Sequence, residues 1–220
     1  MKNLNNITIV CIDTKNKIEA LIALDKSIKN IRFKSYKFFT DELEDIKISR
    51  FENLPEINLE IINIPKIKSK SEYSKFCLID LNQYIFTDFV LTIQHDGYII
   101  NSSCWTDDFT KFDYIGAPWP PEWGYKNRVG NGGFCLKSKK FLELCDTEFF
   151  NFDFKLDILR DKNDISINED FLSCNIYYDK FLSEGIKYAD VETASYFSIE
   201  HPIPEMKQKT FGFHDYFIRR

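Results

Sequence analysis

The sequence lacks the features of a membrane-spanning, secreted or nucleic-acid-binding protein. No apolar run approaches the roughly 20 residues that a helix needs to cross a bilayer, and the first one, residues 7–12, is too short for a signal-peptide core. The 29 Lys and Arg residues are scattered through a chain of net charge -5 and form no basic helix or arginine patch. We therefore expect a cytoplasmic protein that binds no nucleic acid. Its Lys-rich surface leaves open a loose contact with the inner face of the membrane.

Paired-cysteine motifs are also absent. The six cysteines include no CxxC pair, and their neighbours are mostly apolar, as in Val10-Cys11-Ile12. This pattern predicts buried free thiols in a reducing compartment.

Apolar material, by contrast, is plentiful. Hydrophobic residues make up 44% of the 220 residues, with 21 Phe and 11 Tyr, which is enough for the core of one folded domain. No repeat, low-complexity block or linker divides the chain. We expect a single domain in which residues 1–97 form the binding half and residues 98–220 complete the pocket.

The apolar pattern indicates alternating strands and helices. Residues 7–12 form a continuous β-branched run, typical of a strand buried on both faces, and residues 17–28 carry apolar side chains at helical spacing. This succession predicts an α/β domain with a mostly parallel central sheet flanked by helices, related to the Rossmann fold. Further strands are expected at 36–39, 59–64, 89–94 and 134–136, and further helices at 72–85, 138–145 and 169–184, the last ended by Gly185.

The strand at residues 89–94 delivers Asp96 to its carboxyl end, which is where open parallel sheets bind ligands. A carboxylate there can hold a divalent cation that bridges the phosphates of a nucleotide sugar. Gly97 lets the backbone turn and approach the ligand. The alternative is an ordinary Asp-Gly hairpin turn, which the sequence favours equally.

Two histidines are candidates to complete a cation site. Imidazole suits Mn²⁺ as well as Mg²⁺ in a mixed oxygen and nitrogen site, so His95 and His214 both qualify. His214 is favoured because its aromatic segment near the end of the chain could fold back over a bound donor. The commoner outcome for a lone histidine beside Phe213 and Tyr216 is surface packing.

Glu169 and Asp170 place two carboxylates in the first turn of a predicted helix. Either could accept the proton of an acceptor hydroxyl as it attacks. In the structural alternative Asn168 is the N-cap and the acidic residues interact with the helix dipole, for about 0.3–1 kcal/mol. The residues alone favour this alternative.

The Gly130-Asn131-Gly132-Gly133 segment has neither the strand and helix of a dinucleotide fingerprint nor the Lys-Ser/Thr of a P-loop. It either brings the backbone close to a ligand or forms a flexible turn, and the two interpretations are evenly matched. Trp105, Trp119 and Trp123 could stack on sugars, although buried packing is commoner for tryptophan.

Taken in order, five segments resemble the DUF5672 family of bacterial and fungal GT-A-like domains, whose function is unassigned. They are residues 94–97, 112–119, 129–138, 168–170 and 211–214, and the resemblance extends from about Ile7 to His214. It implies a GT-A fold and a glycosyltransferase activity.

The resemblance also assigns roles to single residues. Asp96 resembles the final Asp of the DxD motif, Asp170 the xED carboxylate and His214 the C-terminal histidine of GT-A enzymes, while Gly132-Gly133 resembles their Gly-rich segment. Gln94 departs from the pattern because it replaces the first Asp of DxD. A neutral amide is a weaker ligand, so the metal would be loosely held or dispensable.

Together these observations predict a hexosyltransferase that uses Mn²⁺ or Mg²⁺ to move a sugar from a nucleotide-diphosphate sugar to a hydroxyl of a glycan acceptor, in surface polysaccharide synthesis. Asp96 and His214 would bind metal, and Asp170 or Glu169 would be the base. Donor and sugar binding is assigned to Asp13, Gln94, His95, Asp96, Gly97, Trp119, Asn131, Gly132 and Gly133.

Two other classes remain. Gln94 makes a non-catalytic sugar- or nucleotide-binding domain of the same fold credible, since fold does not fix function. A metal-dependent phosphoester hydrolase or nucleotidyltransferase would need more clustered carboxylates than Asp96 alone provides.

Overall fold

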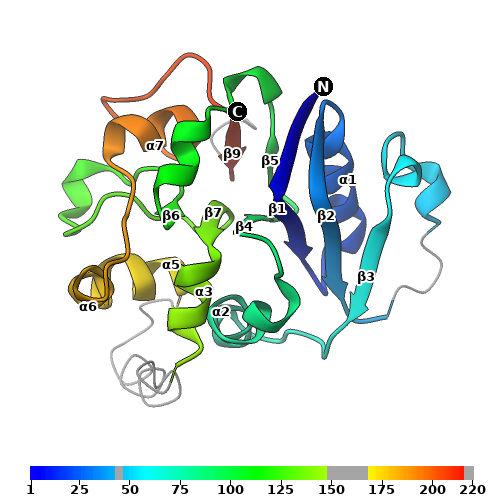
Figure 1. Ribbon diagram of the computed structural model, residues 1–220, viewed down its shortest axis with the longest axis horizontal. Helices are drawn as coiled ribbons and strands as arrows, with labels where there is room; N and C mark the ends of the chain where they lie inside the picture. The colour runs from blue at the N-terminus through cyan, green and yellow to red at the C-terminus, as the bar shows by residue number, and fades with distance from the viewer. Residues whose placement is uncertain (43–46, 148–167, 216–220) are drawn as a thin grey trace.

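A computed structural model describes residues 1–42, 47–147 and 168–215 and has a six-stranded main sheet and a three-stranded second sheet (Figure 1). The main sheet has the order β3-β2-β1-β4-β7-β6, and its first four strands are parallel. The mostly parallel α/β fold predicted from the sequence is confirmed. The main strands are β1 (Lys2–Ile12), β2 (Ile31–Thr40), β3 (Leu59–Asn63), β4 (Phe89–Ile93), β6 (Tyr114–Ile115) and β7 (Phe134–Ser138).

Helices cover both faces of the main sheet (Figure 1). Successive side chains of a strand point to opposite faces, so Ile9 of β1 packs with α1 and α7, whereas Val10 packs with α2, α3 and α6. The two hydrophobic clusters fix the plane of the sheet and hence its edges. The helices are α1 (Lys17–Ile28), α2 (Lys70–Leu78), α3 (Lys139–Cys145), α5 (Glu169–Phe171), α6 (Tyr178–Ser183) and α7 (Val191–Phe197).

Most of the expected elements lie where the apolar pattern predicts them, but the helices differ in three respects. The short helix α7 was not expected from the sequence. The helix expected over 72–85 is the shorter α2, which begins at its cap Ser69 and is followed by a 3₁₀ helix, Asp80–Tyr84. The helix expected over 169–184 is divided by a π-helical turn, Leu172–Ile176, although it ends before Gly185 at φ 78° as predicted. The Ser173 hydroxyl donates to the Glu169 carbonyl oxygen at 2.8 Å, which competes with the regular helical ladder.

All six cysteines are free. Five are buried, as the apolar neighbours predict, and Cys104 is partly exposed. Within the described part of the chain, no helix is long and apolar enough to span a membrane.

The second sheet brings the end of the chain back to the turn after β4. It contains β5 (Gly97–Ile99), β8 (Ser198–Ile199) and β9 (Gly212–His214), in the order β5-β9-β8. Gly97 pairs with His214 across the antiparallel β5 and β9. The expected return of the tail toward Asp96 therefore takes the form of a short strand.

An aromatic cluster anchors β9 against the main sheet. The ring of Phe211, at the start of the tail, lies 5.1 Å from that of Trp105 and 5.9 Å from that of Phe134 in β7. Trp105 is only 5% exposed, so it is a core residue, as the packing interpretation expected. This cluster fixes how far β9 stands from β7.

Gly212 is required by that packing, because a Cβ added there would lie 2.1 Å from Cζ of Phe134. We expect Gly212→Ala to lower the free energy of unfolding by about 1–3 kcal/mol through overpacking. The melting temperature should fall by roughly 2–4 °C per kcal/mol, measured by thermal unfolding.

The double variant Gly212→Ala/Phe134→Leu is the control, because leucine lacks the ring atom that clashes. It should be less destabilised than the sum of the two single variants. Strict additivity, or no effect of Gly212→Ala, would contradict the proposed clash.

Candidate functional site

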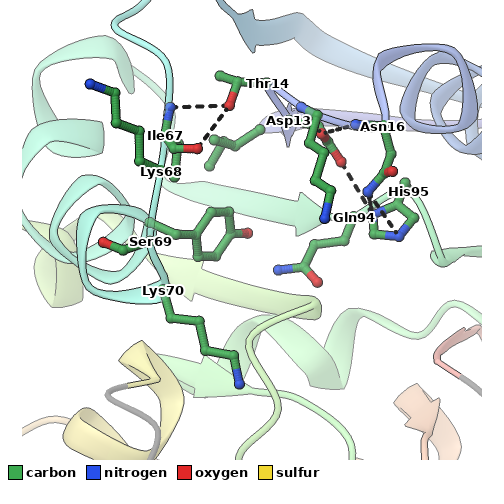
Figure 2. A pocket seen from close by; sticks show the side chains of 12 residues that line it. Asp13, Thr14, Asn16, Ile67, Lys68, Ser69, Lys70, Gln94 and His95 are labelled. Atoms are coloured by element: carbon green, nitrogen blue, oxygen red, sulfur yellow. Dashed lines mark hydrogen bonds and ion pairs between the residues drawn. The ribbon is translucent and has the colours of Figure 1, made fainter.

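The site lies at the carboxyl edge of β1 and β4, which are adjacent parallel strands with Cys11 opposite Ile93. The residues that follow these strands therefore meet. Nδ1 of His95 lies 3.2 Å from Oδ2 of Asp13, and Figure 2 shows the two side chains in contact. Asp13 and His95, both assigned to donor binding from the sequence, thus form one ion pair.

A first cavity of about 360 Å³ opens beside this pair (Figure 2). The Asp13 carboxylate is fixed there by the backbone N–H groups of Lys15 and Asn16, at 2.7 and 2.6 Å. Burial raises the pKa of Asp13, but the hydrogen bonds from His95 and the two N–H groups outweigh it and lower the pKa overall. Lys70 and Tyr73 of α2 line the cavity as well, and neither was singled out from the sequence.

A second cavity of about 410 Å³ shares Lys70, Tyr73 and Gln94 with the first. His214 and Asp170 also line it. A ligand with two joined parts could therefore occupy both cavities, with its junction beside the three shared side chains.

Asp96 lies in a tight turn in which the Gly97 N–H donates to the Gln94 carbonyl oxygen at 3.1 Å. The backbone thus turns at Asp96-Gly97 as the alternative expected, but the turn closes no hairpin, because β4 and β5 belong to different sheets. The Asp96 side chain lines neither cavity, but its Oδ1 is 3.4 Å from Nε2 of His214, which does. Oδ1 is buried and accepts no hydrogen bond.

His214 is surrounded by acceptors. Its Nε2 lies 3.0 Å from Oε1 of Gln94, and its Nδ1 lies 3.3 Å from Oε1 of Glu200. Burial lowers the pKa of His214, but the close contacts with Asp96 and Glu200 and the charges of these two carboxylates outweigh it and raise the pKa to about 10. The ring is therefore an imidazolium at neutral pH, and it lowers the pKa of both carboxylates against their own burial.

The charge of the His214 ring determines the direction of its hydrogen bonds. Asn131 Nδ2 lies 2.8 Å from Nδ1 of His214, yet both ring nitrogens of an imidazolium are donors. Nδ1–H therefore donates to Glu200, and the Asn131 amide N–H also donates to Glu200, which lowers the pKa of that carboxyl further. Asn131 itself is held at φ 61° by its Oδ1, which accepts from the Phe134 N–H at 3.0 Å.

The two positions after Asn131 have room only for glycine, because other side chains lie against their backbone. A Cβ on Gly133 would lie 2.0 Å from Nε2 of His214, and one on Gly132 would lie 1.8 Å from Oε1 of Glu169. The close approach predicted for this loop is thus an approach to the protein's own ionisable groups, and Gly133 also lines the second cavity.

Glu169 and Asp170 lie in the first turn of α5, and Asn168 stands at its N-cap position, as the structural alternative expected. Asn168, however, makes no side-chain cap hydrogen bond, and α5 is only three residues long. Asp170 instead accepts from the N–H groups of Gly132 and Phe171, at 2.8 and 2.7 Å. Burial and the charges of Glu169 and Glu200 outweigh these hydrogen bonds and raise the pKa of Asp170 to about 7.

Trp119, assigned to donor binding from the sequence, lines neither of the first two cavities. It is 5% exposed, packs over Gly130 and lines a third cavity together with Asp170 and Glu200. Sequence reasoning missed Glu200. Glu200 follows the two-residue strand β8, which is too short to show a periodic pattern in the sequence. The one local signal is the adjacent histidine, His201.

Within the ranges that the structure describes, no three His, Cys, Asp or Glu side chains are grouped so that they could hold a metal ion. Asp96 and the Gln94 amide oxygen both contact Nε2 of His214.

Solved structures share this architecture. The chain superposes on the galactosyltransferase LgtC in complex with donor and acceptor sugar analogues with a TM-score of 0.60 and 15% identity, over 94% of this chain and 86% of that one. For mouse xyloside xylosyltransferase 1 in its apo form, the TM-score is 0.58 and the identity 11%, over 98% of both chains. The protein therefore has the GT-A fold of glycosyltransferases.

The sequence comparisons identify a family. No curated protein matches the chain significantly. The model of DUF5672, described as a protein of unknown function, matches residues 56–214, which is more than half of the chain, and the protein belongs to that family.

Proposed function

We propose that the protein transfers a hexosyl group from a nucleotide-diphosphate sugar to a hydroxyl of a glycan acceptor, in surface polysaccharide synthesis. The observation that carries this proposal is the pair of cavities that meet at Lys70, Tyr73 and Gln94, with a cationic His214 on one side. The GT-A fold, whose solved neighbours are sugar transferases, supports it.

The nucleoside would occupy the first cavity and the sugar the second. Asp13 can accept hydrogen bonds from ribose hydroxyls, and its orientation is already fixed by backbone N–H groups. The diphosphate would then pass the shared side chains. Two cations lie there, the Lys70 ammonium and the His214 imidazolium, and both attract phosphate.

Lys70 is exposed, and among the described residues its side chain has no hydrogen-bond or ion-pair partner. We expect Lys70→Met to weaken donor binding by about tenfold, which corresponds to about 1.4 kcal/mol, and to reduce its dependence on salt. Isothermal titration with UDP-glucose, UDP-galactose and GDP-mannose at two salt concentrations measures this.

Lys34→Met is the matched control, because Lys34 is an exposed lysine of β2 that lines none of the three cavities. It should bind the donor as the wild type does. If both variants bind equally well, Lys70 has no part in holding the diphosphate.

A divalent cation is implied by the fold, and the donor atoms fit one. Oε1 of Gln94 and Oδ1 of Asp96 lie 3.0 and 3.4 Å from the same Nε2 of His214. Neighbouring ligands of an octahedral cation with bonds of 2.0–2.1 Å are about 3 Å apart. The buried Oδ1 without a hydrogen bond also suits a ligand. Asp96, His214 and Gln94 would hold the ion, which would neutralise charge on the departing diphosphate.

The cation would have to displace the proton of His214 to bind its nitrogen. With Mn²⁺, we expect nucleotide sugar at 100 times its dissociation constant to stabilise the protein by about 2.7 kcal/mol, and EDTA to remove part of that effect. Asp96→Ala should lose the Mn²⁺-dependent part. Thermal-shift measurements with the donor panel test this.

Asp108→Ala, at an exposed carboxylate of a 3₁₀ helix, is the control and should respond as the wild type does. Equal shifts in Asp96→Ala and the wild type would exclude Asp96 as a ligand. Equal shifts with Mn²⁺ and with EDTA in the wild type would mean that Lys70 and His214 neutralise the diphosphate without a metal.

Asp170 is the proposed base. Its two backbone hydrogen bonds orient the carboxylate, and a pKa of about 7 lets it take up a proton near neutral pH. Glu169 is buried beside it and acts through its charge, since that charge helps to raise the pKa of Asp170.

We expect Asp170→Asn to reduce sugar transfer by about 10²–10⁴-fold while donor binding persists. Because the deprotonated carboxylate is the active form, the wild-type rate should rise with pH through about 7. Glu169→Gln should move that midpoint to lower pH by removing a neighbouring negative charge. The rate of nucleoside diphosphate release is measured for the wild type and both variants over a range of pH. A rate unchanged by Asp170→Asn would refute the assignment of Asp170 as the base.

The second candidate is a non-catalytic nucleotide-sugar-binding domain, which the neutral Gln94 favours. It predicts donor binding without any release of nucleoside diphosphate. The same assay separates the two functions.

A further inference from the structure

A third cavity of about 180 Å³ adjoins the second one and shares Asn168, Asp170 and Glu200 with it. It is smaller than sites for drug-sized ligands, which measure roughly 300–1,000 Å³, so it suits one ring and not an oligosaccharide. Whatever it binds lies beside the proposed base.

One wall of this cavity is aromatic and fixed in place. Trp123 is 42% exposed, and its ring centroid lies 4.8 Å from that of His201 and 5.4 Å from that of Tyr125. Tyr125 in turn lies 5.3 Å from Phe171 and 5.2 Å from Trp119. The exposed indole is thus a flat apolar surface supported by rings behind and beside it.

An ion pair joins the two chain segments that form this wall. Arg128 binds Glu205 through two hydrogen bonds of 2.8 and 3.1 Å, and its Nε donates to the Trp119 carbonyl oxygen at 3.0 Å. Bidentate pairs of this kind restrict geometry as well as adding energy. The segment that carries Trp123 is therefore tied to the one that carries Glu200 and His201.

The other wall is rich in acceptors. Glu200 stands between two imidazoles, with Oε1 3.3 Å from Nδ1 of His214 and Oε2 3.5 Å from Nε2 of His201. Its side chain is 12% exposed, and Oε2 has no hydrogen bond. Such an unsatisfied buried oxygen gains from a donor supplied by a ligand.

We propose that this third cavity is the acceptor subsite and binds one pyranose ring, the terminal sugar of the acceptor, with its apolar face on Trp123 and its hydroxyl edge toward Asp170 and Glu200. A pyranose has one apolar C–H face and an edge of hydroxyl donors, which matches the two walls. The carboxylates disfavour an anionic acceptor, and a lipid chain would leave them unsatisfied.

This inference rests on the proposed function, and the geometry fits its chemistry. The acceptor hydroxyl oxygen forms a bond to the anomeric carbon of the donor sugar, and the bond from that carbon to the phosphate oxygen breaks. The nucleoside diphosphate leaves with the electron pair. The hydroxyl proton passes to Asp170, which lines both cavities and so reaches acceptor and donor.

The test uses the full chain with methyl glucopyranoside, galactopyranoside and mannopyranoside, as both anomers, and with sorbitol as an acyclic polyol. Saturation-transfer NMR measures binding, and KM is measured for any glycoside that accepts sugar. We expect at least one pyranoside, but not sorbitol, to bind. Trp123→Ala should raise the dissociation constant and the KM of that pyranoside by about tenfold. The donor-induced shift in melting temperature, measured on the same sample, reports whether the first two cavities still bind the donor.

Phe86→Ala is the control, because Phe86 is 87% exposed and lines none of the three cavities. It should keep the wild-type affinity. The inference is overturned, and the proposed function stands, if the donor binds but no pyranoside does, if sorbitol binds as well, or if Trp123→Ala binds pyranosides as the wild type does. If the donor is neither bound nor consumed, the proposed function fails, and an acceptor role fails with it.

Discussion

The arrangement of the site depends on a buried imidazolium held between two carboxylates. Removing a charge from water is costly unless it is paired, and His214 meets this condition with Asp96 on one side and Glu200 on the other. The rest of the local structure places the ring there. β9 pairs with β5 opposite Gly97, the aromatic cluster sets the height of β9, and Gly133 leaves room for the ring. Sequence segments far apart are therefore tied together by one charge.

The parts of the fold that could be predicted are those with strong local patterns. β1 and β4 are buried on both faces, so they appear in the sequence as continuous apolar runs, and α1 has a regular apolar stripe. The direction of β7 could not be predicted, because an antiparallel strand buried on both faces has the same apolar pattern as a parallel one. The π-helical turn that divides the helix after Glu169 includes Ser173, whose hydroxyl donates to the Glu169 carbonyl oxygen, and the periodicity of the sequence does not reveal it.

For the site, the order of motifs was more informative than any one of them. The carboxyl-end rule placed Asp96 just after β4, where its side chain contacts His214 but lines neither of the first two cavities, and the family resemblance grouped it with Asp170 and His214. Taken alone, Glu169 and Asp170 resembled ordinary acidic residues in the first turn of a helix, because only the tertiary contact with the Gly132 N–H distinguishes Asp170. Lys70 could not be identified from the sequence because its neighbours are similar to it. It lies in a Lys-rich segment where nothing local distinguishes it from solvent-exposed lysines, and only the two cavities single it out.

The neutral side chain of Gln94 fits the same balance of charges around His214. A carboxylate in its place, 3.0 Å from Nε2 of His214, would be a third anion around the ring and would bind the proton more tightly. It would also add negative charge where a diphosphate has to approach, so that a cation would be needed to offset the repulsion. The amide oxygen accepts the same hydrogen bond without that charge. With Lys70 also present, the site would repel a diphosphate less than one built on two aspartates, so under the proposed function a loosely held cation would suffice.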